Sequence, residues 1–310
     1  MKLDKLNLEK CLPIKPSGWF LEKIKSFPIK LIPLSQKERD QCIIEMINKL
    51  DDEFIVKAGP KRQNDWFKGW GENYEKFCET NNPDDLVPKY YNKFKYLRFN
   101  SELYKIDDDK AELNTVRILI NYIWDIYLKN YSDIIELGAG TCHHIYEISK
   151  NTDEPKNFYA LDWSESTTKI ANKLKEKKFI KSIDSFKFDF YNPFWERSIK
   201  PPEESKSVIY SFAALEQIGE EFYKLFEFIR TTIKPKLVIH LEPIAELLPQ
   251  DDLLANLSAR YIFKRNYLKG YLNFLREQSN AGKIKIIHES RMPFGSLFIE
   301  GYSLVVWAPT

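Results

Sequence analysis

The absence of two kinds of apolar segment narrows the classes to which this chain of 310 residues can belong. The opening residues Met1–Lys5 are followed by no apolar core, so no signal peptide is expected. No uninterrupted apolar run reaches the roughly 18 residues that a bilayer-spanning helix requires. We therefore expect no membrane partner and a cytoplasmic location.

Cysteine is scarce, and neither sign of charge dominates. The four cysteines are widely spaced and form no Cys-x-x-Cys pair, so neither a zinc site nor a disulfide scaffold is predicted. No other metal site is expected. The 47 basic and 45 acidic residues give a formal net charge of only +2, with no long block of one sign. This balance argues against nucleic acid as an obligatory partner, and the sequence predicts no oligomeric state.

The pattern of apolar residues changes near residue 110. Residues 1–110 are predicted to form a mainly helical N-terminal cap, with a helix capped by Ser35 and a second helix over 65–80. Along the second helix three aromatic residues share one face: Trp66, Trp70 and Tyr74. We interpret this face as core packing, with an aromatic wall facing a substrate as the alternative.

Strand and helix patterns alternate through residues 111–310, the second predicted domain. After a helix over 111–130, strands are expected at 133–137, 158–162, 186–190, 208–212 and 237–241. Helical patterns separate most of these strands, which predicts right-handed βαβ units and a parallel sheet covered on both faces. A long helix over 251–278 precedes two more strands, at 283–288 and 297–307, whose short connection favours an antiparallel hairpin. The fold class is therefore α/β and Rossmann-like.

The strongest local motif lies where the first of these strands meets its helix. Gly138 and Gly140 allow a sharp turn and close approach of a ligand to the backbone. A dinucleotide fingerprint would have a third glycine where this chain has His143. Glu136 would repel a pyrophosphate but suits a cation, such as the ammonium of S-adenosylmethionine.

Acidic residues also end the next two strands. Asp162 lies about twenty residues beyond the glycines and is placed to accept both ribose hydroxyls of a nucleoside. Asp189 is a candidate acceptor for an adenine amino group, and Phe190 is a candidate for stacking on the ring. Three acids at the carboxyl ends of three consecutive strands are a stronger signal than the glycine pair alone.

With these motifs, residues 111–310 resemble class I S-adenosylmethionine-dependent methyltransferases. The matching segments are Glu136–Gly140, Leu161–Ser164, Ser211–Ile218 and Ile233–Pro243. The resemblance implies a seven-stranded, mostly parallel sheet with the last strand antiparallel, and S-adenosyl-L-methionine as the cofactor. It adds Trp163 and Phe212 to the cofactor-binding candidates.

The chain departs from the family pattern at three places. Cys142 occupies a common glycine position, Gln217 replaces the usual histidine, and no Gly-Gly pair follows Pro235. The change at Gln217 removes a candidate base and any metal role of that histidine. None of the departures affects the three acids proposed to hold the cofactor.

Candidate catalytic residues follow the fourth and fifth predicted strands. His240 and Glu242 are two residues apart and share one face of a strand, and Glu216 lies just beyond the preceding strand. An alcohol acceptor must lose a proton, which a base at this position would accept. The alternatives are a core histidine at His240 and a helix cap at Glu216.

Further residues are weaker candidates for acceptor contact. His143 or His144 begins a helix beside the glycines, and Arg260, Lys264, Tyr267 and Tyr271 fall on one face of the predicted long helix. Within the N-terminal cap, which is expected to fold over the site as a lid, the candidates are Tyr96, Arg98 and Tyr104.

The sequence thus predicts a methyltransferase acting on an oxygen or nitrogen of a small-molecule acceptor. A pocket rich in carboxylates would favour an amine, and His240 as base would favour a hydroxyl, such as that of a sugar or natural product. We lean slightly toward oxygen. The alternatives are a protein or RNA substrate, a module that binds the cofactor without turnover, and a nucleotide-dependent oxidoreductase.

Overall fold

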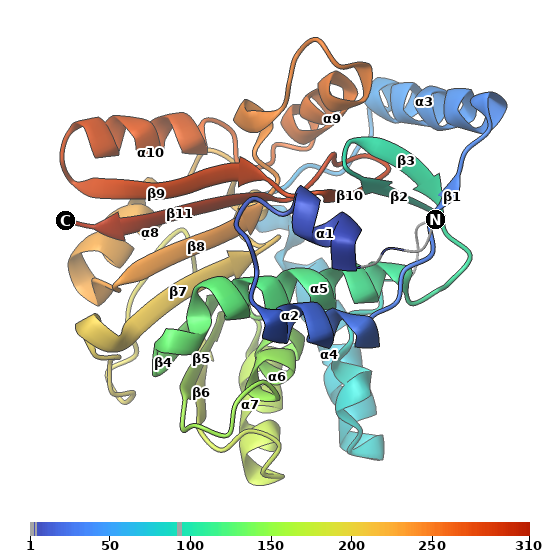
Figure 1. Ribbon diagram of the computed structural model, residues 1–310. Coiled ribbons are helices and arrows are strands. Elements are labelled where there is room, and N and C mark those ends of the chain that lie inside the picture. The colour runs from blue at the N-terminus through green and yellow to red at the C-terminus, as the bar shows by residue number, and fades with distance from the viewer. Residues whose placement is uncertain (1–2, 4, 92–94) are drawn as a thin grey trace.

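A seven-stranded sheet forms the centre of the molecule (Figure 1). The computed structural model describes residue 3 and residues 5–91 and 95–310. The strands lie in the order β6 (Ile183–Lys187), β5 (Asn157–Asp162), β4 (Asp133–Leu137), β7 (Ser207–Phe212), β8 (Leu237–Glu242), β11 (Ser303–Pro309) and β9 (Ile284–Arg291).

The direction of the strands confirms the predicted fold class. The pairs β4–β5, β4–β7, β5–β6 and β7–β8 are parallel. The last strand, β11, runs antiparallel to both of its neighbours, β8 and β9. This is the Rossmann-like, mostly parallel sheet with a reversed last strand that the resemblance implied.

Helices precede the sheet and connect its strands. The α-helices are α1 (Lys5–Cys11), α2 (Gly18–Lys23), α3 (Gln36–Asp51), α4 (Gln63–Thr80), α5 (Ala111–Ile126), α6 (His143–Ser149), α7 (Glu165–Glu176), α8 (Tyr223–Phe228), α9 (Leu253–Lys264) and α10 (Tyr271–Asn280). Short 3₁₀ helices are η1 (Ile24–Ser26), η2 (Pro60–Arg62), η3 (Pro83–Leu86), η4 (Leu128–Asn130), η5 (Glu204–Lys206), η6 (Leu215–Ile218) and η8 (Ala245–Leu247), and a π-helical turn, η7 (Ile229–Ile233), extends α8. Within the described part of the chain, none of the helices is both long and apolar enough to cross a membrane.

The two faces of the large sheet bury separate apolar cores. Alternate residues of one strand point to opposite faces, so Ile134 packs with α5, α6 and α7, whereas Ile135 packs with α8 and α10. Figure 1 shows α5 beneath the sheet and α10 on the other side of it. Because both faces are covered, every residue of β4, β7 and β8 is buried, as expected for parallel strands between helices.

A small antiparallel sheet joins the N-terminal cap to the C-terminal part of the chain. It contains β1 (Ile32–Pro33), β3 (Glu102–Lys105), β2 (Tyr96–Phe99) and β10 (Phe294–Ser296), in that order. The sequence predicted the cap to be mainly helical and did not predict this hairpin. It also predicted a short connection between the last two strands of the large sheet, which is wrong, because residues 292–302 leave that sheet to supply β10.

Two other element boundaries differ from those predicted. The long helix over 251–278 is two helices, α9 and α10, separated at 265–270, where Asn266 and Gly270 have positive φ angles of 57° and 79°. The four residues expected on one helical face therefore do not share a helix. The third predicted strand begins earlier, at Ile183, so Asp189 and Phe190 lie in the loop beyond it.

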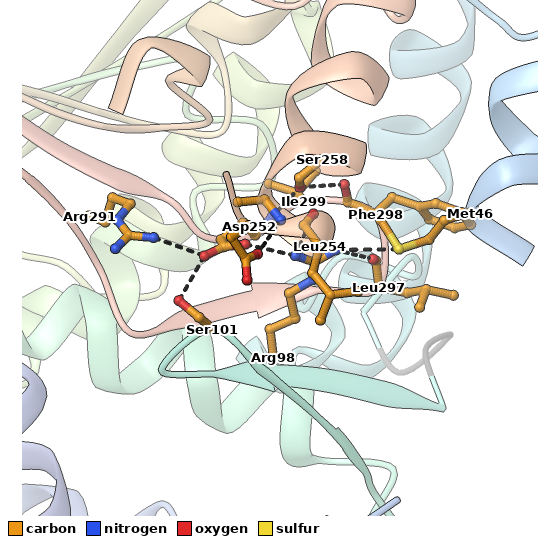
Figure 2. Close-up of polar contacts among 12 residues, drawn as sticks. Met46, Arg98, Ser101, Asp252, Leu254, Ser258, Arg291, Leu297, Phe298 and Ile299 are labelled. Carbon is orange, nitrogen blue, oxygen red and sulfur yellow. Dashed lines mark hydrogen bonds and ion pairs between the residues drawn. The ribbon is translucent and has the colours of Figure 1, made fainter. Parts of the chain in front are cut away.

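A buried ion pair fixes the small sheet to α9 (Figure 2). The Arg98 guanidinium on β2 donates from Nη1 to Glu300 Oε2 at 2.9 Å and from Nη2 to the Leu297 carbonyl at 2.8 Å. Nη1 also donates to the Leu254 carbonyl at the start of α9. Ser101 and Arg291 donate to the other oxygen of Glu300. Arg98 is fully buried in this network, so its predicted contact with an acceptor is wrong.

Candidate active site

A cleft opens at the carboxyl ends of β4, β5 and β7, the edge at which open α/β sheets usually bind their ligands. Its walls come from the sheet and from the N-terminal cap. The lining residues are Trp66, Trp70, Pro88, Tyr90, Gly138, Ala139, Gly140, Thr141, His143, His144, Asp162, Trp163, Phe188, Phe190, Tyr191, Phe212, Ala213, Ala214, Gln217 and Ile218. Six of the eight predicted cofactor-binding residues are in this set: Gly138, Gly140, Asp162, Trp163, Phe190 and Phe212.

The glycine loop between β4 and α6 forms the floor of the cleft. Gly138 and Gly140 have positive φ angles of 73° and 50°, a conformation that glycine adopts without strain. A Cβ on Gly138 would lie 2.3 Å from the Ala214 Cβ, and one on Gly140 would lie 3.1 Å from the Trp70 ring. Glycine is thus required here both by the turn and by the close approach of two other segments.

Asp162, at the end of β5, is buried beside this loop. Its Oδ2 accepts from the Gly140 amide at 2.9 Å, and its Oδ1 accepts from the Ser164 amide at 2.8 Å. Burial raises the pKa of the Asp162 carboxyl to about 6, although these two amide hydrogen bonds oppose the shift. A carboxylate oxygen has more than one acceptor position, so Asp162 can hold the loop and still accept from a ligand in the cleft.

Aromatic side chains form much of the remaining wall. Trp163 and Phe190 follow β5 and β6, and the Tyr191 hydroxyl donates to the Gln217 carbonyl across the cleft at 3.4 Å. Asp189, in contrast, is not a lining residue. It accepts from the Tyr191 amide and the Asn192 side chain, which makes it part of its own turn. Its predicted contact with an adenine amino group is not supported by this placement.

Helix α4 closes the cleft from the side of the cap. The rings of Trp66 and Trp70 stack with centroids 5.3 Å apart, and Tyr90 packs against both of them. Both tryptophans line the cleft, whereas Tyr74 of the same face packs against the core. That the two tryptophans face a substrate stays a prediction. Arg62 lies over the Trp66 ring at 4.7 Å and donates to Gln217 Oε1 at 3.0 Å. The sequence signal for the wall was the four-residue spacing. That spacing cannot distinguish a helix face that packs on the core from one that lines a ligand site.

Glu136 is buried behind the cleft rather than in its lining. Its Oε1 lies 2.8 Å from Nδ1 of His144, and Nε2 of the same ring lies 3.2 Å from the Tyr91 hydroxyl. His144 itself lines the cleft and packs against Phe212. Glu136 therefore reaches the lining through His144. Its Oε2 has no hydrogen-bond partner, so its predicted contact with an ammonium stays a prediction.

His143, the other histidine of this helix, also lines the cleft. It is buried, and neither of its ring nitrogens has a hydrogen-bond partner. Burial lowers its pKa well below the usual value, so the ring is neutral. Nε1 of Trp66 is a second buried lining atom without a partner. Unsatisfied polar atoms of this kind are rare in folded proteins, and both residues belong to the cleft lining.

His240 is a core residue and does not line the cleft, so its predicted catalytic role is not supported. Its Nε2 accepts from Trp307 Nε1 at 3.1 Å and lies 2.9 Å from the Tyr271 hydroxyl, and its Nδ1 lies 2.9 Å from Ser211 Oγ. Burial lowers its pKa to about 3. The ring is enclosed in the core and is not part of the cleft lining, so it cannot reach a substrate bound there.

Glu242 and Glu216 likewise lie outside the lining set. Glu242 accepts from Ser211 Oγ at 2.7 Å and from the backbone amides of Ala214, Leu215 and Glu216, so it organises the loop after β7. Glu216 accepts from the Gln217 side chain. Burial raises the pKa of Glu242 to about 7 and that of Glu216 to about 8, with the Glu242 charge adding to the second shift.

In the described residues, no three side chains of His, Cys, Asp or Glu are grouped as metal ligands.

Comparisons with known proteins concern the fold. No protein-family model matches the chain, and no curated protein sequence does. Among solved structures, TnmH is 13% identical with a TM-score of 0.45, and the match covers 65% of this chain and 56% of TnmH. A putative methyltransferase from Bacillus halodurans is 13% identical with a TM-score of 0.40, covering 57% and 71% of the two chains. The 16S rRNA methylase ArmA is 12% identical with a TM-score of 0.44, covering 78% and 98%. The chain thus spans just over half of the length of TnmH.

Proposed function

We propose that this protein transfers a methyl group from S-adenosylmethionine to an oxygen or nitrogen of a small-molecule acceptor bound in the cleft. The observation that carries the proposal is the placement of Asp162 at the end of β5, next to the Gly138–Gly140 loop and inside the cleft. An acid at this position suits a pair of ribose hydroxyls. Among the described residues that line the cleft, Asp162 is the one carboxylate.

The rest of the lining suits the other parts of the cofactor. Trp163, Phe190 and Ile218 offer apolar surface for an adenine ring near Asp162. Trp66 Nε1 and the unpartnered nitrogens of His143 offer polar contacts for the amino acid moiety. When bound, the cofactor would supply a sulfonium methyl group, which an acceptor nucleophile attacks.

The chain itself would contribute mainly position and exclusion of water. Holding two reactants in line can account for much of the rate of a bimolecular reaction. The stacked tryptophans of α4 and Tyr90 cover the glycine loop, so they would enclose the reacting atoms in an apolar wall. This wall favours a small organic acceptor over a folded macromolecule. An oxidoreductase that binds a dinucleotide is less well supported, because His143 occupies the position of the third glycine.

Calorimetric titration of the purified protein with S-adenosylmethionine tests this proposal. The matched variants are Asp162→Asn and Asp189→Ala, because both acids follow strands but only Asp162 lines the cleft. Hydrogen bonds to a charged group contribute roughly 1.5–3 kcal/mol, so Asp162→Asn is expected to weaken binding by about 10- to 150-fold. Asp189→Ala should change the dissociation constant less than about threefold.

NAD and S-adenosylhomocysteine complete the titration. Binding of S-adenosylhomocysteine together with no binding of NAD is the expected outcome. If the protein as purified carries no such cofactor and binds neither S-adenosylmethionine nor S-adenosylhomocysteine, the proposal fails. Binding of NAD alone would support an oxidoreductase instead.

A further inference from the structure

A chain of polar contacts runs from the buried end of β4 to the cleft. It begins at the carboxylate of Glu136, passes through both ring nitrogens of His144 and continues to the Tyr91 hydroxyl. The Tyr91 hydroxyl also bonds with that of Tyr90, which lines the cleft. The histidine is thus the one link of this chain that both lines the cleft and can take up a proton.

The contact with Glu136 sets the tautomer of His144. A carboxylate only accepts hydrogen bonds, so the 2.8 Å contact places a proton on Nδ1 of His144. Nε2 is then left with its lone pair, which accepts from the Tyr91 hydroxyl 3.2 Å away. A carboxylate behind an imidazole in this way fixes the ring and stabilises the imidazolium that forms when Nε2 accepts a proton.

The aromatic surroundings of His144 indicate the kind of acceptor. The ring packs against Phe212 with centroids 4.9 Å apart, and Tyr90 joins the Trp66–Trp70 stack on the other side of the cleft. A planar aromatic ring matches these walls. His144 as a base suits a hydroxyl, which must lose its proton to react, more than a neutral amine, which attacks through its lone pair.

We propose that His144, oriented by Glu136, is the base of this site and that its acceptor is a phenolic hydroxyl. This inference rests on the proposed methyl transfer. In the reaction the phenol oxygen bonds to the methyl carbon, the carbon–sulfur bond breaks with its electron pair remaining on sulfur, and the hydroxyl proton passes to Nε2 of His144. The proton travels directly or by exchange through the Tyr91 hydroxyl, and it leaves to solvent after turnover.

Phenols of different acidity separate a base from a residue that only binds. Phenol requires a base, whereas 4-nitrophenol is a far stronger acid and depends on a base much less. Since a general base contributes typically 10²–10⁴-fold, His144→Ala should lower kcat/KM for phenol by about that factor. The loss for 4-nitrophenol should be less than about tenfold, and added imidazole should partly restore turnover of phenol. Glu136→Gln should give an intermediate loss for phenol, and His288→Ala, outside the cleft, should match the wild type.

Nitrogen-15 NMR of the free protein measures the tautomer of His144 and requires no turnover. Of the four histidines, the resonances of His144 are identified by their loss in His144→Gln. We expect a proton on Nδ1 and a lone pair on Nε2, and a smaller population of this tautomer in Glu136→Gln. The opposite tautomer in the wild type would overturn the proposal.

The remaining outcomes separate this inference from the proposed function. Retained binding of S-adenosylhomocysteine by His144→Ala shows that the variant folds, and Glu136→Gln serves where it does not. Equal losses for both phenols, or methylation of anilines but of neither phenol, would overturn the assignment of base and acceptor while leaving methyl transfer in place. If the wild type binds the cofactor but methylates neither phenol, the phenolic acceptor is likewise overturned. Failure to bind the cofactor at all would instead refute the proposed function.

Discussion

Two buried carboxyl groups, those of Glu216 and Glu242, lie beside the loop after β7. They differ in how readily each keeps its proton. Glu242 accepts four hydrogen bonds, from Ser211 and from three backbone amides, each of which stabilises its ionised form. Glu216 accepts one side-chain bond, from Gln217, and lies near the Glu242 charge. Glu216 is therefore the member of the pair that keeps its proton near neutral pH.

This assignment predicts how stability depends on pH. Both pKa values are raised in the folded state, from the usual 4.5 to about 8 for Glu216 and about 7 for Glu242. Folding therefore binds protons, and stability declines as pH rises from 4.5 to 8. Glu216→Gln removes one ionisable group but keeps an acceptor for Gln217. The variant should melt several degrees higher than the wild type at about pH 9 and nearly equally at about pH 4.5, as measured by calorimetry.

A surface carboxyl provides the control for that comparison. Glu220 is exposed at the end of the same loop, so Glu220→Gln should leave the pH dependence of melting unchanged. A destabilising effect of Glu216→Gln at pH 9 would show that the ionised form of Glu216 contributes to the folded state.

At the scale of elements, the ends of β7 and β8 and the loop that follows β7 behave as one unit. Ser211 Oγ donates to Glu242, and the contact between Nδ1 of His240 and Ser211 Oγ then makes that hydroxyl the acceptor for the ring proton. Ala213, with a positive φ angle of 50°, begins the loop that lines the cleft. The two residues expected to be catalytic, His240 and Glu242, thus shape the cleft from behind.

Removing the Ser211 hydroxyl tests this role. In Ser211→Ala the Nδ1 proton of His240 loses its acceptor and Glu242 loses a donor, which should cost about 1–3 kcal/mol of unfolding free energy. Because the loop lines the cleft, binding of S-adenosylhomocysteine, if it occupies the cleft as proposed, should weaken severalfold. Denaturant unfolding and calorimetry measure the two effects. The exposed Ser205 supplies the control, Ser205→Ala, and full stability of Ser211→Ala would contradict the role.

The large sheet was predictable because its signals are local. Five apolar runs separated by helical patterns determine parallel strands, and four of their positions agree with the structure within a residue. The small sheet was not predictable in this way, because β10 pairs with β2 from nearly two hundred residues away in the sequence and the strands are only two to four residues long. The break between α9 and α10 has a local cause, the positive φ angles at Asn266 and Gly270, but the helical apolar pattern continues across it.

The sequence predicts those residues of the candidate site whose position is fixed by the strand that directly precedes them. Gly138, Gly140 and Asp162 follow from their positions after β4 and β5. Which polar side chain meets which partner depends on tertiary packing, and the sequence held no signal that Glu136 would bond His144 or that His240 would bond Trp307. The wall from α4 was visible only as an aromatic stripe, which a core would also show.

At the scale of the whole molecule, the floor of the cleft comes from the large sheet, whereas its cover comes from α4 and the segment after it in the N-terminal cap. Helix α4 packs against α7 through Phe77, which is buried in the same apolar core as Ile170, and further contacts join the cover to the site. Arg62 donates to Gln217, and Thr141 donates to the Leu86 carbonyl at 2.5 Å. Trp70 lies directly over Gly140. Since this cover lies over the glycine loop, we expect entry of a ligand as long as S-adenosylmethionine to require movement of the cover.

Hydrogen exchange measured with and without S-adenosylhomocysteine tests this requirement. Backbone amides of α4 and η3 should exchange more slowly when the ligand is bound, because binding favours the closed arrangement. Amides of β4 and β5, which lie between two covered faces, should change little.

Arg62→Ala removes the contacts with Gln217 and Trp66, so exchange in α4 of the free protein should become faster, and the ligand should dissociate several times faster in stopped-flow measurements. Lys61→Ala, at an exposed neighbour, should match the wild type. Unchanged exchange in α4 on binding, together with unchanged dissociation from Arg62→Ala, would mean that the cap is a fixed wall and that the ligand enters by another route.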